Sequence, residues 1–562
     1  TNTVVLSESI ARAYFVAVTT AVGKTIQLWC SRVPLQVTGI FKDLPANTDI
    51  KVRLGISHAT LEKLAPGAFT GAYQWEAADG NTQCFVLLKK KDNLAAVTAG
   101  LPAFVRRYYR GSSTRSTELQ LQPLANMHLN KQYHNFESGN LSSKELWALG
   151  LIGAFLLLVA CINFINLATA QSVNRAREIG VRKVLGSNRL QLFSQFMTET
   201  AVITVLSMAA AILLTILALP YAGKLMNREL SWQLLLHPAA VTALLAGVVI
   251  VSLLAGFYPG MVVSGFNPVA AIKSRGNIRP GGASLRRGLV IFQFVIAQLL
   301  VIGTLVVVKQ MRYVREQPMG FTRDAVVLIN LPSDSTLKLK YDYLKSRMQD
   351  IPGVTSASLC VDAPSADWKF AQEFYFDTNP VKQPFRIEAK AADADYYKTF
   401  DIHVKAGRLP YPSDTLKELV VNETTVKKLG LSSPEKIIGK TITTTEHKTF
   451  PVVGVINDFN SQSLHEAIAP MLIGSDRNSY EFIALRLNPQ KMNATLKDVE
   501  QTFTRIYPSY LYDLTFLDER ISSYYRADAI TAKLFKIFAC LAVFISCLGL
   551  YGLISFMVTN RT

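Results

Sequence analysis

The sequence predicts an α+β membrane protein, in which an α-helical transmembrane bundle carries two mixed α/β domains outside the membrane. Three observations lead to this fold class. Five segments lack Asp, Glu, Lys and Arg over about the 20 residues that a helix needs to cross a bilayer. Basic residues gather in two of the connections between these segments. Two long blocks of mixed charge lie outside them, so the 562-residue chain is expected to hold several domains.

The first mixed-charge block, residues 1–145, alternates short strand patterns with turn signals and helical patterns. We expect strands at Val4–Leu6, Lys24–Trp29, Leu35–Phe41, Cys84–Leu88 and Leu119–Leu124. We expect helices at Glu8–Phe15 and Asn93–Tyr109. This pattern predicts a mixed α/β domain before the first apolar segment.

The five apolar segments are the predicted membrane spans. They cover approximately 146–169, 200–220, 237–263, 288–308 and 537–558. Asn163 and Asn166 share one face of the first span, where we favour hydrogen bonds between helices over the lining of a pathway. Gly256 and Gly260, with Pro259 between them, predict close helix packing or a kink in the third span.

The distribution of basic residues orients the spans. The connection 170–199 carries five of them, and the connection 264–287 carries five more without an acidic residue. Connections rich in Lys and Arg stay in the cytoplasm, so both are expected inside. Alternation of the spans then places residues 1–145 and 309–532 outside. The excess of 59 Lys and Arg over 41 Asp and Glu thus follows membrane topology, and nucleic acid is not expected as a partner.

The remaining residues show no pattern typical of an enzyme or a metal protein. The six cysteines form no Cys-x-x-Cys pair, and the seven histidines have no metal-ligand spacing. Gly-Lys-Thr occurs at 23–25 and 439–441, but the first glycine of a phosphate-binding loop is absent, since Val18 and Pro434 stand there. We interpret both motifs as turns that enter strands and predict no catalytic, cofactor or metal site.

The second mixed-charge block repeats the first. Val4–Glu8 aligns with Leu419–Glu423, Gly23–Ile26 with Gly439–Ile442, and Gly39–Asp43 with Gly454–Asp458. The spans that follow also correspond, since Cys161 and Asn174-Arg175 match Cys547 and Asn560-Arg561. The shared order of these matches predicts a duplicated unit, made of an outer domain followed by a span.

The connection between the first two spans holds a short basic amphipathic stretch, residues 175–186, which we predict to lie in a helix over about 172–190. Ile179, Val181, Val184 and Leu185 are assigned to an apolar face, and the arginines and lysine to a charged one. Such a helix suits a groove in a partner protein, or equally a surface of anionic lipid headgroups. Composition leaves these two alternatives open.

The spans themselves predict how the protein obtains energy. Ion-coupled transporters usually bury titratable side chains inside their spans. The centres of the five predicted spans contain none. Ion coupling is therefore disfavoured, and we expect energy to arrive mechanically from a cytoplasmic partner.

Particular motifs resemble those of the FtsX/MacB-type ABC transporter permease family. They are Asn163–Ser172, Arg175–Gly186, Phe41–Asn47 and Leu285–Phe294, together with the duplicated outer domain. The resemblance covers essentially the whole chain and is closest to the long two-repeat form found in Bacteroidota. It implies that 1–145 and 309–532 are MacB-like periplasmic core domains, that 146–287 is an FtsX-like transmembrane domain of three spans, and that 288–308 and 533–562 hold two further spans.

In such permeases the stretch equivalent to 175–186 is the coupling helix that contacts a separate ATPase. Carried over by resemblance, the docking residues are Arg177, Glu178, Ile179, Gly180, Arg182, Lys183, Leu185 and Gly186. The resemblance implies a multi-pass protein of the bacterial inner membrane that binds two copies of a cytoplasmic ABC ATPase. ATP is bound by that partner, and no cofactor is expected in this chain. Membrane lipid and an envelope or outer-membrane protein are further expected partners.

Three functions remain open at this point. The chain is expected to couple ATP hydrolysis to export or mechanotransmission across the envelope, to activate an envelope partner without moving a substrate, or to serve as a membrane-anchored scaffold. The chain begins at Thr1 and stops at Thr562 beside an apolar segment, so we expect a piece of a longer protein with eight spans. The substrate is not readable from the sequence.

Overall fold

The computed structural model divides into an outer unit and a helical unit, which are described separately. The outer unit comprises 1–128, 133–139 and 316–526, and the helical unit comprises 129–132, 140–315 and 527–562. The structure describes residues 2–15, 17–27, 33–45, 48–49, 52–64, 84–89, 93–109, 118–130, 142–226, 230–265, 283–366, 369–444 and 447–559. The predicted basic connection 264–287 lies largely outside these ranges.

Five helices of the helical unit are long and apolar enough to cross a membrane. They are α6 (Ser143–Val184), α7 (Arg189–Met226), α8 (Pro238–Gly265), α10 (Ala283–Glu316) and α17 (Arg526–Thr559), with the short η4 (Trp232–Leu236) between α7 and α8. Each extends beyond the apolar segment that predicts it. Polar residues continue the helix past the hydrophobic stretch, because backbone hydrogen bonding does not end where apolar side chains do.

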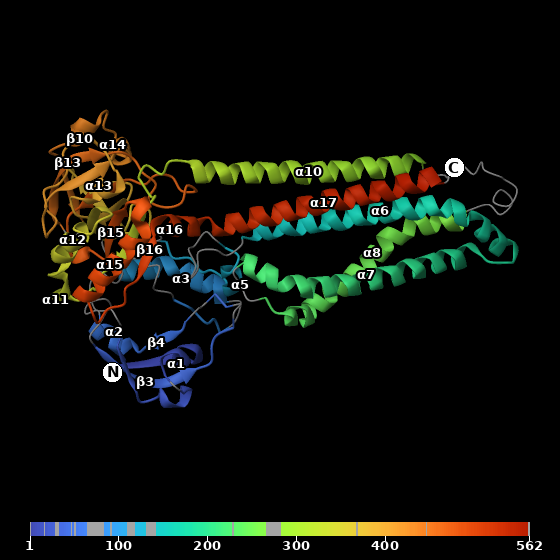
Figure 1. Cartoon of the computed structure of the whole chain (residues 1–562), viewed down its shortest axis with the longest axis horizontal. Coiled ribbons are helices and arrows are strands. Elements are labelled where there is room, and N and C mark those ends of the chain that lie inside the picture. The colour runs from blue at the N-terminus through green and yellow to red at the C-terminus, as the bar shows by residue number, and fades with distance from the viewer. Residues whose placement is uncertain are drawn as a thin grey trace. The chain divides into compact units, whose positions relative to one another are not determined.

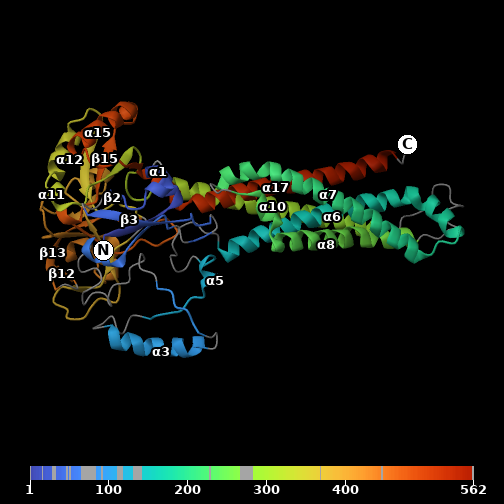
Figure 2. The same cartoon turned by 90° about the horizontal axis from the view of Figure 1, so that it is seen from below.

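Helices α6, α10 and α17 run side by side (Figures 1 and 2) and share one apolar core. Val159 of α6 and Ala542 of α17 are fully buried in it. Asn163 Nδ2 of α6 donates to the carbonyl of Ile545 in α17 at 2.7 Å. The predicted interhelical hydrogen bond of Asn163 is therefore confirmed, and it fixes the register of these two spans.

Helix α8 packs closely on α7 through its glycines. A Cβ added to Gly256 would lie 3.0 Å from the sulfur of Met197, and one added to Gly260 would lie 3.1 Å from the Phe193 ring. Pro259 is buried between them within the helix. The close packing predicted from this glycine pair is confirmed.

The described part of the first outer domain has one four-stranded sheet with strand order β2-β3-β1-β4. The strands are β1 (Thr3–Ser7), β2 (Thr25–Gln27), β3 (Pro34–Phe41) and β4 (Leu54–Ile56). The helical elements are α1 (Glu8–Tyr14), η1 (Val18–Thr20), α2 (His58–Leu64), α3 (Asn93–Tyr108) and α5 (Leu124–Met127). The first three predicted strands are confirmed within the described residues.

The strands predicted at Cys84–Leu88 and Leu119–Leu124 are wrong. Neither segment forms a ladder with the described residues, and Leu87 is 97% exposed. An apolar run becomes a strand only when a neighbouring strand accepts its hydrogen bonds. The sequence pattern shows the run but not whether a partner strand lies beside it.

The second outer domain contains two sheets. The mixed sheet has the order β7-β9-β14-β11-β13-β12-β8, with β10 also paired to β13. Its strands are β7 (Ala371–Gln372), β8 (Phe374–Phe376), β9 (Ile387–Ala391), β10 (Val404–Gly407), β11 (Leu419–Asn422), β12 (Thr441–Thr444), β13 (Thr449–Ile456) and β14 (Met471–Gly474). The helical elements α13 (Tyr396–Phe400), α14 (Glu423–Lys428), η5 (Pro434–Ile437) and η6 (Arg477–Ser479) accompany them.

The smaller sheet is antiparallel and has the order β16-β5-β15-β6. Its strands are β5 (Val326–Asn330), β6 (Val354–Cys360), β15 (Phe482–Leu487) and β16 (Leu514–Phe516). The helical elements in this part are α11 (Ser335–Lys338), α12 (Tyr341–Gln349), η7 (Pro489–Lys491), α15 (Met492–Ile506) and α16 (Leu517–Tyr524). Buried side chains of α12 and α15 form one core with this sheet, and the mixed sheet has a core of its own.

The two outer domains share strand register, which confirms the predicted repeat for these segments. Strand β1 pairs parallel with β3 as β11 does with β13, at a constant offset of 415 residues. In both pairs the register shifts at the same position, between Val4 and Val5 in the first and between Leu419 and Val420 in the second. The two Gly-Lys-Thr motifs are equivalent turns that lead into β2 and β12, as predicted.

One equivalent pair of glycines gives a test of this register. A Cβ on Gly454 would lie 2.1 Å from the Arg408 carbonyl oxygen, whereas one on Gly39 would meet only Val5 at an ordinary 3.5 Å. We expect Gly454→Ala to lower the free energy of unfolding by about 1–3 kcal/mol through overpacking. Thermal unfolding of the full chain measures this loss, and Gly39→Ala is the matched control. If Gly454→Ala and Gly39→Ala lowered the free energy of unfolding by the same amount, the assigned register would be contradicted.

Candidate functional site

Residues 175–184 of the basic stretch form the end of α6, so the helix predicted over about 172–190 is continuous with the first span and ends at Val184 rather than near residue 190. The helix stops at Val184, and Gly186 takes the left-handed conformation with φ +105°. The amide of Ser187 donates to the Arg182 carbonyl at 3.0 Å, and that of Gly186 to the Lys183 carbonyl at 3.1 Å. These two bonds form a Schellman motif, which ends the helix because glycine adopts this conformation without strain.

The next helix starts immediately after this turn. The Asn188 side chain accepts from the Gln191 amide at 2.8 Å, and the Gln191 side chain accepts from the Asn188 amide at 3.0 Å. This reciprocal capping fixes the first turn of α7. The chain therefore reverses over residues 185–188, in a turn that is defined on both sides.

Polar side chains tie the end of α6 to the beginning of α7. The Arg175 guanidinium lies 2.9 Å from the Glu199 carboxylate. Arg182 pairs with Glu178 of its own helix at 2.6 Å and donates to Gln195 Oε1 of α7 at 2.8 Å. Each such exposed contact stabilises little by itself. Together they hold the two helix ends in one orientation.

The face of α6 that points into the helical unit contains Ile179. Ile179 is 6% exposed and packs with Leu192 of α7 and Val263 of α8. Lys183 Nζ donates to the Ser264 carbonyl at 2.6 Å, near the end of α8, where carbonyl groups lack helical partners. Burial and then the charge of Arg189 lower the pKa of Lys183. These residues join α6 to α8.

Four apolar side chains at and beside the turn are exposed. We call this surface the tip patch, and it consists of Val181, Val184, Leu185 and Leu190. Their exposed fractions are 48%, 68%, 80% and 74%. Arg189 is exposed beside the patch in the sequence, and Arg182 is 41% exposed. An apolar surface next to cationic groups is typical of a surface that binds a partner.

The structure distributes the eight predicted docking residues over two sides. Leu185 and Gly186 are exposed at the turn, and Glu178 is exposed in a pair with Arg182. Ile179 and Gly180 are buried and Lys183 is half-buried, so they contribute to helix packing. The backbone of Arg177 lies in α6, and its side chain lies outside the described residues. The docking role of these residues stays a prediction.

The apolar face predicted from the sequence was assigned wrongly for Ile179. At about 100° per residue, Ile179 falls opposite Val181 and Val184 on a helix. Leu190 was missed, because it belongs to the next helix. The sequence contains a signal for that turn, since Gly186 is followed by Asn188 and Gln191 in the pattern of a helix stop and a new capped start.

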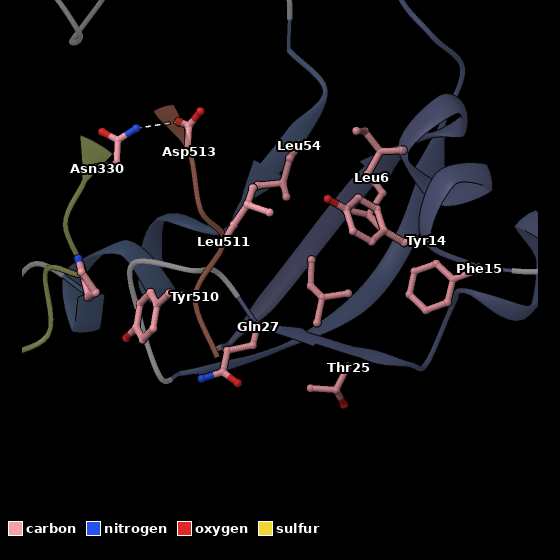
Figure 3. A pocket seen from close by; sticks show the side chains of 13 residues that line it. Leu6, Tyr14, Phe15, Thr25, Gln27, Leu54, Asn330, Tyr510, Leu511 and Asp513 are labelled. Atoms are coloured by element: carbon pink, nitrogen blue, oxygen red, sulfur yellow. Dashed lines mark hydrogen bonds between the residues drawn. The ribbon is translucent and has the colours of Figure 1, made fainter. Parts of the chain in front are cut away.

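The outer unit contains a second candidate, a cavity of about 700 Å³ (Figure 3). Most of its lining is apolar, including Leu6, Tyr14 and Leu511. Asn330 Nδ2 donates to the Asp513 carboxylate at 2.6 Å within the lining. No Lys, Arg or His belongs to the described lining, so the cavity presents an apolar surface with one carboxylate.

Comparison with protein families gives two matches. The model described as FtsX-like permease C-terminal matches residues 150–268. The model described as MacB-like periplasmic core domain matches residues 1–104 and 289–502, which is more than half of the chain. The first match contains the turn at residues 185–188.

Individual relatives match over shorter lengths. The uncharacterized ABC transporter permease YknZ of Bacillus subtilis (strain 168) is 35% identical over 68 residues, which are 12% of this chain and 17% of YknZ. The extracellular domain of a noncanonic ABC-type transporter YknZ from Gram-positive bacteria covers 34% of this chain and 99% of its own length, at 12% identity and a TM-score of 0.25. A domain of a protein described as a permease from Porphyromonas gingivalis covers 35% and 92%, at 14% identity and a TM-score of 0.25.

Proposed function

Because this chain belongs to the FtsX/MacB-like family of ABC transporter permeases, we propose that its tip patch docks on a cytoplasmic ATPase and passes mechanical work to the outer domains. The family and the five apolar helices place the chain in the bacterial inner membrane, with its outer domains in the periplasm. Family membership also implies a partner ATPase subunit. Three points belong to the proposal: the identity of that subunit, its copy number, and the coupling of its ATP hydrolysis to movement of this chain.

One observation carries the proposal, namely the exposure of the tip patch at a turn that is rigidly fixed. Leu185 and Leu190 are 80% and 74% exposed, although the turn between them is capped on both sides. Apolar side chains on a rigid turn lose little conformational entropy when they enter a groove. They are therefore suited to receive a force from a partner rather than to fold on contact with it.

The proposed cycle needs two rigid connections. ATP binding would close two ATPase copies together, and each copy would move the helix turn that it holds. The contacts between Arg175 and Glu199, and between Lys183 and Ser264, would carry this movement into α7 and α8. The outer domains would then change position and act on a substrate or envelope partner outside the membrane. ATP itself would be bound by the partner, and no cofactor is proposed for this chain.

A pull-down tests the docking. The full chain carrying both Leu185→Asp and Leu190→Asp is called the tip variant. It is purified from membranes in detergent, and the recovered ATPase is identified by mass spectrometry. We expect recovery to fall by more than about tenfold, since a charge in an apolar contact at the centre of an interface costs at least about 2 kcal/mol. Both positions are exposed, so the variant is expected to fold normally.

The matched control is Leu234→Asp, which makes the same chemical change at an exposed position of η4. Its recovery of the ATPase is expected to equal that of the unaltered chain. Unchanged recovery with the tip variant would contradict docking. If the tip variant lost binding to vesicles of anionic lipid but still recovered the ATPase, the result would support the alternative that the turn lies on lipid headgroups.

Activity distinguishes the three possible functions. Export predicts that a substrate stimulates ATP hydrolysis by the complex in proteoliposomes. Signalling predicts instead that hydrolysis activates an envelope partner without net transport. A scaffold predicts that no ATPase is recovered with the unaltered chain, which would contradict the proposal.

A further inference from the structure

The polypeptide enters the second outer domain directly after α10, and this entry is fixed to one loop. We call residues 457–464, which follow β13, the β13 loop. The amide of Asn460 donates to the Met319 carbonyl at 2.9 Å, and Asn457 Nδ2 donates to the Gly320 carbonyl at 3.0 Å. A Cβ on Gly320 would lie 2.6 Å from the Asp458 carbonyl oxygen. The entry therefore packs against the loop at backbone distance.

The polypeptide leaves the same domain through α16 into α17, and this exit also reaches the β13 loop. The Leu464 amide donates to the hydroxyl of Tyr525 at 2.7 Å, and Tyr525 is 7% exposed. Arg520 of α16 binds the buried carboxylate of Asp362 through two bonds of 2.7 and 2.8 Å. The segments that lead to α10 and to α17 thus both end on one loop of eight residues.

The other side of the β13 loop is fixed to the mixed sheet. The Asp458 carboxylate accepts from the Thr424 amide at 2.8 Å and from its hydroxyl at 2.9 Å, at the start of α14. Asn457 Oδ1 accepts from the His403 amide at 2.6 Å, just before β10. The loop therefore connects both membrane-directed segments to the body of the domain.

The first outer domain contains two contacts that parallel those of the β13 loop. The described residues that correspond to the β13 loop, at the offset of 415, are 42–45 and 48–49, which follow β3 in the sequence. Asp43 accepts from the Ser9 hydroxyl at 2.6 Å, as Asp458 accepts from Thr424. Asp49, which corresponds to Leu464, lies 2.6 Å from His128, in the segment that leads towards α6. These two contacts parallel those of Asp458 and Leu464 in the second domain.

From these contacts of the β13 loop we propose that it is the joint through which movement of α10 and α17 reaches the second outer domain. The proposal rests on the proposed function, since it requires spans that move. Movement passes through packed contacts with discrete arrangements, and a loop that is bonded on three sides provides such contacts.

The test removes two bonds of the joint without changing the size of any side chain appreciably. Asn457→Asp replaces the donor to Gly320 by an acceptor, and Tyr525→Phe removes the acceptor of the Leu464 amide. The control variant makes the same two changes at Asn488→Asp and Tyr343→Phe. Tyr343 is 59% exposed, and the Asn488 side chain caps η7 through an oxygen that aspartate retains.

The measurement uses the full chain with its ATPase in nanodiscs, with and without ATP and vanadate. One pair of spin labels, at exposed Leu206 and Leu305, reports the spans. A second pair, at exposed Leu339 of the outer unit and Trp147 of α6, reports movement of the outer domain relative to α6. We expect the joint variant to keep the nucleotide-dependent change of the first pair and to lose at least about half of that of the second.

Two results would overturn the joint. The first is an outer-domain change of full size in the joint variant while the spans also move. The second is a lower ATPase recovery with the joint variant than with the control, since the joint lies in the periplasmic domain and predicts no effect on docking. Docking itself is judged by the unaltered chain and the tip variant in the pull-down, so the two proposals can fail independently.

Discussion

Replacing Arg520 by methionine is expected to lower the free energy of unfolding of the second outer domain by about 3–5 kcal/mol. The reason is that Asp362 is 2% exposed and accepts both guanidinium bonds. Without Arg520 its carboxylate stays buried and has lost that partner, which costs far more than the pair contributes. Since domains are stable by only about 5–15 kcal/mol, this loss is a large part of the total stability. Thermal unfolding and protease resistance of the full chain measure this effect.

The same domain offers a matched control. Arg408 also binds a carboxylate, that of Glu418, at 2.7 and 2.5 Å, but this pair is exposed. Water replaces such a partner, so Arg408→Met is expected to change stability little. The double variant Arg520→Met/Asp362→Leu is expected to recover much of the lost stability. A loss of the same size for both single variants would contradict burial as the cause.

Replacing Gly549 by valine is expected to separate α6 from α17. A Cβ at this position would lie 2.0 Å from Asn163 Oδ1, and the remaining methyl groups need still more space. Overpacking of this kind costs about 1–3 kcal/mol, and here it also breaks the hydrogen bond from Asn163 to Ile545. We expect a lower midpoint of thermal unfolding for the chain in detergent.

Gly552→Val is the control for this variant, because no atom lies within 4 Å of a Cβ at Gly552 on the same helix. Combining Gly549→Val with Asn163→Ala is expected to restore part of the stability, since the side chain that clashes is removed. Gly549→Val with unaltered stability would show that α6 and α17 do not pack at this point.

Much of the fold follows from local patterns. The five spans are visible because hydropathy over 20 residues is a local property. Strand β3 and helix α3 lie where their periodicity predicts them. The segments 84–88 and 119–124 have a similar pattern and form no strand. Strand formation depends on a neighbour that is distant in sequence, and a local pattern contains no information about it.

For the candidate site, too, some features follow from the sequence and others only from the tertiary structure. The charge and composition of residues 175–186 indicate its side of the membrane and its amphipathic nature. Which side chains remain exposed depends on α7 and α8, since Leu192 and Val263 cover Ile179 while Leu185 has no such cover. Gln195, which accepts from Arg182, and Ser264, which accepts from Lys183, belong to other helices, and the spacing of these residues in the sequence gives no signal of either contact.

The sequence by itself determined the class of the protein, the five candidate spans that the described residues contain, their orientation and the internal repeat. Each of these depends on residue type and order alone. Only the tertiary structure decided which residues form the tip patch, and that Gly549 lies opposite Asn163. It also revealed that Met319, which follows α10, and Tyr525, which precedes α17, are both bonded to the β13 loop. These contacts join residues far apart in the chain, and their energy depends on distances that packing alone sets.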